Sequence, residues 1–96
     1  MSQQKRLHAL VSGRVQGVSF RYYTQQAAIL IGVTGWVRNL QDRRVEVVAE
    51  GTAEQLRALE KFLHHGSPSA RVDQLDITFA DATGEFDSFD ITYLIR

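Results

Sequence analysis

The chain contains no cysteine among its 96 residues, and this absence excludes several kinds of chemistry at once. Without a thiol, the protein cannot use a thiolate nucleophile, bind zinc through thiolates or form a disulfide framework. A domain of this size must therefore be stabilised by the packing of its own core. The absence does not indicate the cellular compartment.

The sequence also lacks an excess of charge and any long apolar run. Eleven Lys and Arg residues balance eleven Asp and Glu, so no net charge attracts nucleic acid or an anionic membrane. No stretch approaches the roughly 20 apolar residues of a membrane span, and residues 1–6 contain no apolar signal core. These features predict a cytoplasmic protein without nucleic-acid or membrane partners. One domain is expected over residues 1–96, with a flexible N-terminus over 1–6.

Five segments either alternate apolar with polar residues or are rich in β-prone residues, and both patterns predict strands. They lie at 7–12, 36–40, 45–50, 75–79 and 89–93. The second and third are separated by only four residues, which predicts an antiparallel hairpin. Its turn contains Asp42-Arg43-Arg44 and lacks the glycine that such turns favour, so the turn type stays open.

Two segments instead repeat apolar residues every three to four positions, which predicts helices. The first is expected to be capped by Ser19 and to end at Gly32. Its predicted inward stripe is Tyr23, Ala27, Leu30 and Ile31. The second opens with a capping box from Thr52 to Gln55 and ends before Gly66 and Pro68. Its predicted inward residues are Leu56, Leu59, Phe62 and Leu63.

This order of elements predicts an α+β fold, the ferredoxin-like split βαβ sandwich. The expected succession is β-α-β-β-α-β with a short additional C-terminal strand. Two helices should cover one face of an antiparallel sheet. Many unrelated functions share this architecture, so the fold alone does not indicate an activity.

The segment from Gly13 to Arg21 joins the first strand to the first helix and has the composition of an anion-binding loop. Its two glycines permit backbone turns that direct several N–H groups to one point, next to a positive helix N-terminus. Arg21 adds a planar fork of donors that suits phosphate oxygens. On composition alone, a simple tight turn with a solvated Arg21 fits equally well. The loop lacks the Gly-Lys-Ser/Thr ending of nucleotide-binding P-loops, because Val18-Ser19-Phe20 stands there.

Two stretches together resemble the signatures of the acylphosphatase family. They are Gly13-Arg14-Val15-Gln16-Gly17-Val18-Ser19-Phe20-Arg21 and Gly35-Trp36-Val37-Arg38-Asn39, with weaker similarity over 45–51 and 70–73. The resemblance implies hydrolysis of acyl phosphates to a carboxylate and inorganic phosphate, without metal or cofactor. It implies catalytic roles for Arg21 and Asn39. It further implies phosphate binding by Arg21 and by the main-chain N–H groups of Val15, Gln16, Gly17, Val18, Ser19 and Phe20.

The same resemblance assigns Asn39 to orienting the attacking water, because an amide cannot accept a proton at neutral pH. We expect a monomer that acts on a small acyl phosphate and that inorganic phosphate inhibits competitively. Arg14 and Arg38 either raise the positive potential near this site or are simply solvated.

Two other interpretations remain at this stage. Ferredoxin-like domains can bind RNA through aromatic residues on their central strands, but residues 7–12 and 45–50 contain none. The chain could also be an accessory domain of a larger carbamoyl-handling maturation protein, whose signature would look alike. The absence of zinc-finger cysteines favours a free-standing enzyme.

Overall fold

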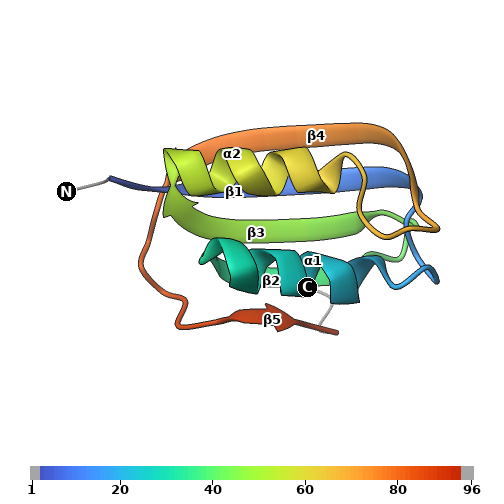
Figure 1. Ribbon diagram of the computed structural model, residues 1–96, viewed down its shortest axis with the longest axis horizontal. Helices are drawn as coiled ribbons and strands as arrows, with labels where there is room; N and C mark the ends of the chain where they lie inside the picture. Colours follow the sequence, from blue (N-terminus) through green and yellow to red (C-terminus); the bar gives the residue numbers. More distant parts are fainter. Residues whose placement is uncertain (1–2, 94–96) are drawn as a thin grey trace.

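The computed structural model describes residues 3–93, which form two helices and five strands (Figure 1). Along the chain these are β1 (Gln4–Arg14), α1 (Phe20–Ile31), β2 (Thr34–Asn39), β3 (Val45–Thr52), α2 (Ala53–Leu63), β4 (Arg71–Asp81) and β5 (Phe89–Ile91). This succession confirms the predicted ferredoxin-like order with its additional C-terminal strand.

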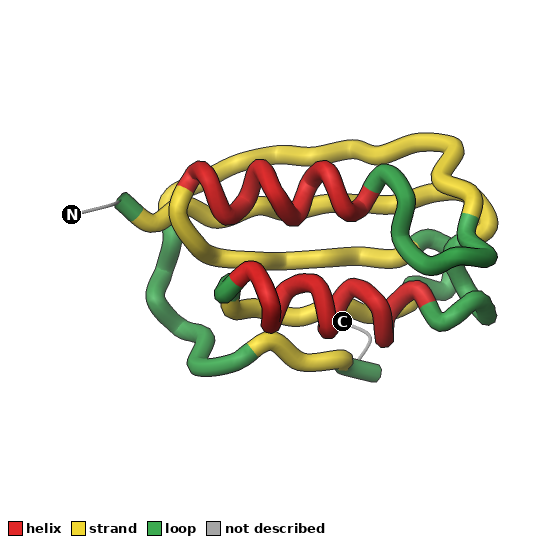
Figure 2. Tube along the Cα trace, viewed as in Figure 1, coloured by secondary structure: helices red, strands yellow, loops and turns green. Residues whose placement is uncertain are grey.

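The strands form one sheet in the order β4-β1-β3-β2-β5, and both helices lie on the same face of it (Figure 2). The four longer strands pair antiparallel, as expected. β5 differs because it pairs parallel with β2, so the sheet is mixed. The chain leaves β4 at one edge and crosses to the opposite edge before it enters β5 (Figure 1). This crossing places the residues around β5 beside β2.

The core lies between the helices and the inward-facing residues of the three central strands. Alternate residues of β1 and β3 face the same side because side chains alternate along a strand. Its fully buried members include Leu7, Ala9, Val11, Ala28, Val37, Val45, Val47, Ala49, Leu59 and Leu63. The predicted inward face of α2 is confirmed, with Phe62 partly buried against this cluster. Its capping box is also present, since Gln55 N donates to Thr52 Oγ1 at 3.2 Å and Thr52 N donates to Gln55 Oε1 at 2.9 Å.

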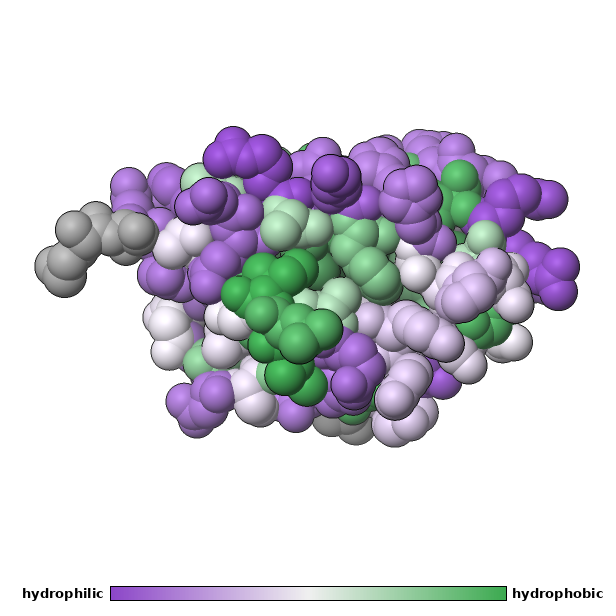
Figure 3. All heavy atoms as spheres, in the orientation of Figure 1, coloured by the Kyte–Doolittle hydropathy of each residue, from purple (hydrophilic) through white to green (hydrophobic). Residues whose placement is uncertain are grey.

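The predicted inward stripe of α1 is wrong for Tyr23 and Leu30, which are exposed, whereas Ile31 packs partly against the core as predicted. The buried residues are Phe20, Thr24 and Ala28, whereas Leu30 is 87% exposed. Figure 3 shows the resulting cluster of apolar side chains on the helix-bearing surface, where Ile29 is also exposed. Apolar residues occur around much of this helix, so their spacing does not determine which side faces inward. Phe20 decides the orientation because it inserts into the core at the first helical position.

The expected cap by the Ser19 side chain is also wrong. Ser19 does occupy the N-cap position, but its backbone is left-handed with φ of 61°, and its hydroxyl makes no capping hydrogen bond. Side-chain capping normally requires an extended backbone at this position. The start of α1 therefore has no side-chain cap from Ser19.

The N-terminal segment is more regular than the sequence suggests. Residues 4–6, expected to belong to a flexible tail, pair in β1 with residues 50–52 of β3. A polar segment can still form a strand when its main-chain groups find partners. Residues 1 and 2 lie outside the described part of the chain. Neither helix in residues 3–93 has the length and apolar character to cross a membrane.

Candidate active site

The loop between β1 and α1 is shaped by residues with positive φ. Gly13 has φ of 128° and lies so close to β4 that a Cβ atom would overlap the Arg71 carbonyl oxygen. Farther along, Gly17 and Ser19 adopt φ of 74° and 61°. Left-handed residues in such a loop turn successive N–H groups toward a common side and create a concave anion site.

The helix that follows adds to this site. The first intrahelical bond runs from Tyr23 N to Ser19 O at 3.1 Å, so the preceding N–H groups lie at the open helix end. These N–H groups and the helix dipole favour an anion at the start of α1. The geometry is therefore compatible with the binding of an anion at this loop.

A cavity of about 390 Å³ opens at this loop. Its lining residues are Val15, Gly17, Ser19, Phe20, Arg21, Tyr22, Asn39, Ile91 and Tyr93. The structure thus brings Arg21 and Asn39 together with four of the six loop residues that the sequence suggests for phosphate binding. Gln16 and Val18 do not line the cavity, and Val18 packs partly against the core.

Asn39 is the last residue of β2 and lies on the helix side of the sheet. Val37, two residues earlier on the same face, is fully buried. The Asn39 Oδ1 atom is buried and accepts no hydrogen bond from any described residue. A buried acceptor without a partner costs about 1–3 kcal/mol, so such atoms are rare unless they serve a ligand. This oxygen is therefore available to a bound molecule in the cavity.

Arg21 lies at the first turn of α1 and carries the positive charge of the cavity. Its Cζ atom is 5.0 Å from the ring centroid of Tyr93, a cation–π distance. Within residues 3–93, no ion pair engages its guanidinium, so its donors are free for an anionic ligand.

The sequence did not indicate Ile91 and Tyr93 as cavity residues. They reach the site because β5 pairs parallel with β2 at the sheet edge, a contact between segments far apart in the chain. No local pattern in the sequence signals this pairing. Together with Tyr22, they give the cavity a partly aromatic wall.

The β2–β3 turn, left open by the sequence, follows directly after Asn39. Leu40 N donates to Arg44 O at 2.8 Å, and Arg43 takes the left-handed conformation with φ of 76°. Asp42 accepts from Arg44 Nε at 2.8 Å, and hydrogen bonds from Arg44 lower the pKa of the Asp42 carboxyl. Arg43 thus occupies the position that a glycine would favour.

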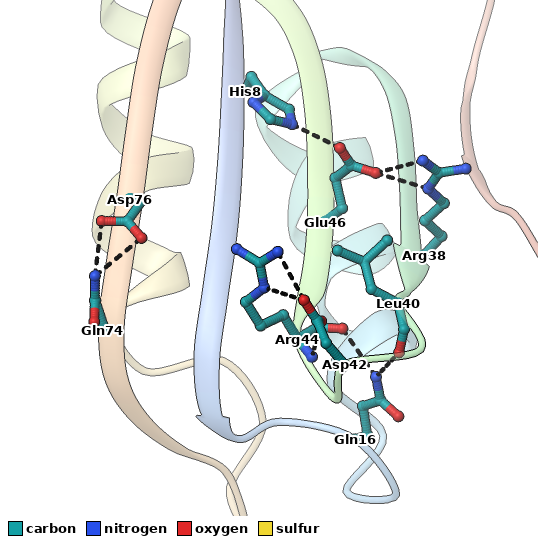
Figure 4. A network of polar contacts seen from close by, with 9 residues as sticks. All are labelled: His8, Gln16, Arg38, Leu40, Asp42, Arg44, Glu46, Gln74 and Asp76. Atoms are coloured by element: carbon teal, nitrogen blue, oxygen red, sulfur yellow. Dashed lines mark hydrogen bonds and ion pairs between the residues drawn. The ribbon is translucent and has the colours of Figure 1, made fainter. Parts of the chain in front are cut away.

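The Gln16 side chain joins the loop to this turn. Its Nε2 atom donates to the carbonyl oxygens of Leu40 and Arg44, each at 2.9 Å (Figure 4). The sequence suggested only a main-chain role for Gln16. Its side chain bridges two segments that meet only after folding.

Arginines also gather on the outer side of the loop. A second hollow of about 590 Å³ there is lined by Arg14, Arg43 and Arg71, with Asp73 as the acidic member. Asp73 pairs with Arg71 at 3.0 Å, which leaves local positive charge from the other two. Arg38, by contrast, pairs with Glu46 at 2.7 Å and stacks on Trp36.

The described residues contain no group of three or more His, Asp or Glu side chains that could hold a metal ion.

A sequence model of the family described as acylphosphatase matches residues 7–91 of this chain. The chain belongs to the acylphosphatase family. An acylphosphatase of Syntrophobacter fumaroxidans is 47% identical over 90 residues, which cover 94% of this chain and 93% of that protein. One of Methylococcus capsulatus is 53% identical over 85 residues, covering 88% of this chain and 92% of that protein.

The fold comparison agrees with the sequence comparison. The crystal structure of acylphosphatase from Bacillus subtilis superposes with a TM-score of 0.90 at 36% identity. The match covers 93% of this chain and 99% of that one. The protein is thus an enzyme of the hydrolase class.

Proposed function

We propose that the protein hydrolyses the carboxyl–phosphate anhydride of small acyl phosphates without a metal ion. The substrate phosphate would sit at the main-chain N–H groups of residues 15–20, with Arg21 donating to its oxygens. Arginine suits this role because its planar donors match two phosphate oxygens at once. These donors would stabilise the charge on the phosphoryl oxygens as a loose transition state develops.

Asn39 would hold the attacking water. Its buried Oδ1 without a partner is the observation that carries this proposal, because it can accept a hydrogen bond from a water next to Arg21. The water oxygen attacks phosphorus, the bond between phosphorus and the acyl oxygen breaks, and the water proton passes to a phosphate oxygen. An amide orients this water but does not deprotonate it.

The leaving group explains why so few residues suffice. A carboxylate has a conjugate acid with a pKa of roughly 4, so it departs without receiving a proton. No general acid is then required, and correct placement of water and phosphate can supply much of the acceleration. The aromatic wall of Tyr22 and Tyr93 suits a small apolar acyl group.

Benzoyl phosphate hydrolysis in the presence of a chelator tests this function. Turnover should be unaffected by the chelator. The Arg21→Ala variant should lose on the order of 10³-fold in kcat/KM, by analogy with other phosphoryl clamps. The Asn39→Ala variant should lose roughly 10²- to 10³-fold, mostly in kcat, by analogy with lost positioned donors.

Arg57→Ala is the matched control, because Arg57 is exposed on α2 and does not line the cavity. It should keep full activity.

Inorganic phosphate should inhibit competitively, raising KM without changing kcat. Light scattering at assay concentrations should give the mass of a monomer. Equal activity in the unchanged protein and in the Arg21 and Asn39 variants would refute the mechanism. A cytoplasmic location stays a prediction.

A further inference from the structure

The proposed site combines two segments that are not adjacent in the sequence. The phosphate loop and Arg21 precede and begin α1, whereas Asn39 ends β2 just before the 40–44 turn. Catalysis by placement depends on the spacing between these parts, and an error of about 1 Å can cost roughly 10²-fold in rate. Some contact must therefore set the distance between loop and turn.

The Gln16 carboxamide makes such a contact. Both hydrogens of its Nε2 group are used, one toward Leu40 O and one toward Arg44 O. Leu40 directly follows Asn39, and Arg44 O also accepts from Leu40 N at 2.8 Å. The side chain thus binds both ends of the turn that carries Asn39, as Figure 4 shows.

These carbonyl groups could in principle have been satisfied by water at the molecular surface. A side chain that donates to two carbonyl oxygens at 2.9 Å instead gives a defined geometry, because the planar carboxamide restricts where both acceptors can lie. The main chain of the same residue lies between Val15 and Gly17, two of the residues that line the cavity. One residue therefore connects the phosphate loop and the water-holding strand end.

We propose that the Gln16 side chain is a positioning residue that sets Asn39 at its working distance from the phosphate loop. This inference rests on the proposed function. Gln16 does not touch the reacting atoms through its side chain and acts through Asn39. Its loss should therefore lower kcat, while phosphate affinity should change little because Arg21 and the loop N–H groups remain.

The kinetic test compares Gln16→Met, which keeps the size but removes the donors, with the unchanged protein. We expect kcat to fall about 10- to 100-fold, as for other small misplacements. KM and the inhibition constant for inorganic phosphate should move by less than about threefold. Gln16→Asn, which is too short to reach both carbonyl oxygens, provides a second variant in case the first folds poorly.

A double-mutant cycle then distinguishes the positioning of Asn39 by Gln16 from a general distortion of the loop. In the Asn39→Ala background, Gln16→Met should have little further effect on kcat, because residues that act together are not additive. Equal losses in both backgrounds would overturn the proposal, and so would a kcat unaffected by Gln16→Met.

The matched control is Gln55→Met. Gln55, in the first turn of α2, also donates from its carboxamide to a main-chain carbonyl, that of Ile31 at the end of α1. Figure 1 shows that the end of α1 and the start of α2 lie opposite the loop between β1 and α1. This variant should lose stability with kcat unchanged.

A second readout does not require activity. Amide hydrogen exchange at Leu40, measured by NMR, should become faster in Gln16→Met, and unchanged protection would overturn the proposed connection. If the unchanged protein fails to hydrolyse acyl phosphates, the proposed function fails, and this exchange measurement still decides whether Gln16 holds the turn.

Discussion

Gly66 lies directly against the ring of Phe20, so a Cβ atom at Gly66 would overlap Phe20 Cε2 and sit 2.5 Å from Cδ2. Gly66 also has φ of 64°, and its N–H donates to the Phe62 carbonyl oxygen at 2.9 Å. Phe20 stands between Ser19 and Arg21, at the start of α1. The loop after α2 therefore packs against the start of α1, next to the proposed phosphate loop.

Gly66→Ala should destabilise the protein and disturb the site. Overpacking of a core typically costs about 1–3 kcal/mol, and the left-handed backbone adds roughly 1 kcal/mol or more for a residue with a side chain. Urea unfolding should show this loss, and phosphate should bind more weakly because Phe20 must shift. Gly84→Ala is the control, since Gly84 has a similar φ of 74° but no atom lies within 4 Å of the place where a Cβ would sit. A phosphate affinity equal in both variants would contradict the supporting role.

Arg43→Gly should stabilise the protein. Arg43 holds φ of 76°, a conformation that costs a non-glycine residue roughly 1 kcal/mol, whereas glycine adopts it freely. Glycine also gains entropy when unfolded, so we expect a net gain of about 0.5 kcal/mol. Thermal and urea unfolding would measure it. Arg44→Gly should instead destabilise, because Arg44 pairs with Asp42 at 2.7 Å. A loss of stability in Arg43→Gly would mean that the arginine side chain contributes more than the backbone costs.

Glu50 should make stability depend on pH in the acid range. Burial opposes its charge, but hydrogen bonds from Thr83 N, Arg6 and Gly84 N outweigh burial and lower the pKa of its carboxyl. A carboxyl with a lowered pKa in the folded state stabilises the protein above its unfolded pKa of about 4.3. This contribution is lost as the pH falls through the folded pKa.

Glu50→Gln should therefore cost roughly 1.5–3 kcal/mol at pH 7, the range for a hydrogen bond to a charged group. The difference from the unchanged protein should shrink as the pH falls below about 4. Denaturant titrations from pH 7 to pH 3 would follow it. Asp87→Asn, an exposed change in the same loop, should give curves parallel to those of the unchanged protein. A Glu50→Gln difference that stays constant with pH would refute this role of the charge.

The arginines outside the phosphate loop should accelerate substrate capture. Arg14 lies opposite Arg71 across β1 and β4, a like-charge pair that does not favour stability. Arg14→Gln should leave Tm unchanged or slightly raised. It should lower kcat/KM severalfold at low salt and less above about 0.15 M, where the Debye length is about 8 Å.

The salt dependence of kcat/KM for benzoyl phosphate measures this effect, with kcat expected to stay constant. Arg57→Gln on α2 serves as the control and should reproduce the salt dependence of the unchanged protein. If kcat/KM depended on salt in the same way in the Arg14 and Arg57 variants, the idea that Arg14 attracts the substrate would be refuted.

The succession of elements could be predicted before any coordinates were known, whereas phosphate binding by the loop stays a prediction. Alternation along Leu7–Val11 and the Thr52–Gln55 capping box are local patterns, and the structure reproduces both. The glycines at positions 13 and 17 indicated a turning main chain because only glycine adopts such φ values at little cost. The two signature stretches were sufficient to indicate the family.

How these parts meet depends on the folded chain as a whole. Which face of α1 is buried follows from the insertion of Phe20 near Gly66, and helix periodicity cannot specify this. The presence of Tyr93 at the cavity depends on the parallel pairing of β5 with β2. The bonds of Gln16 to the turn after Asn39 likewise join segments distant in sequence. Such contacts result from the packing of segments that are distant in the sequence, so local patterns of residues do not predict them.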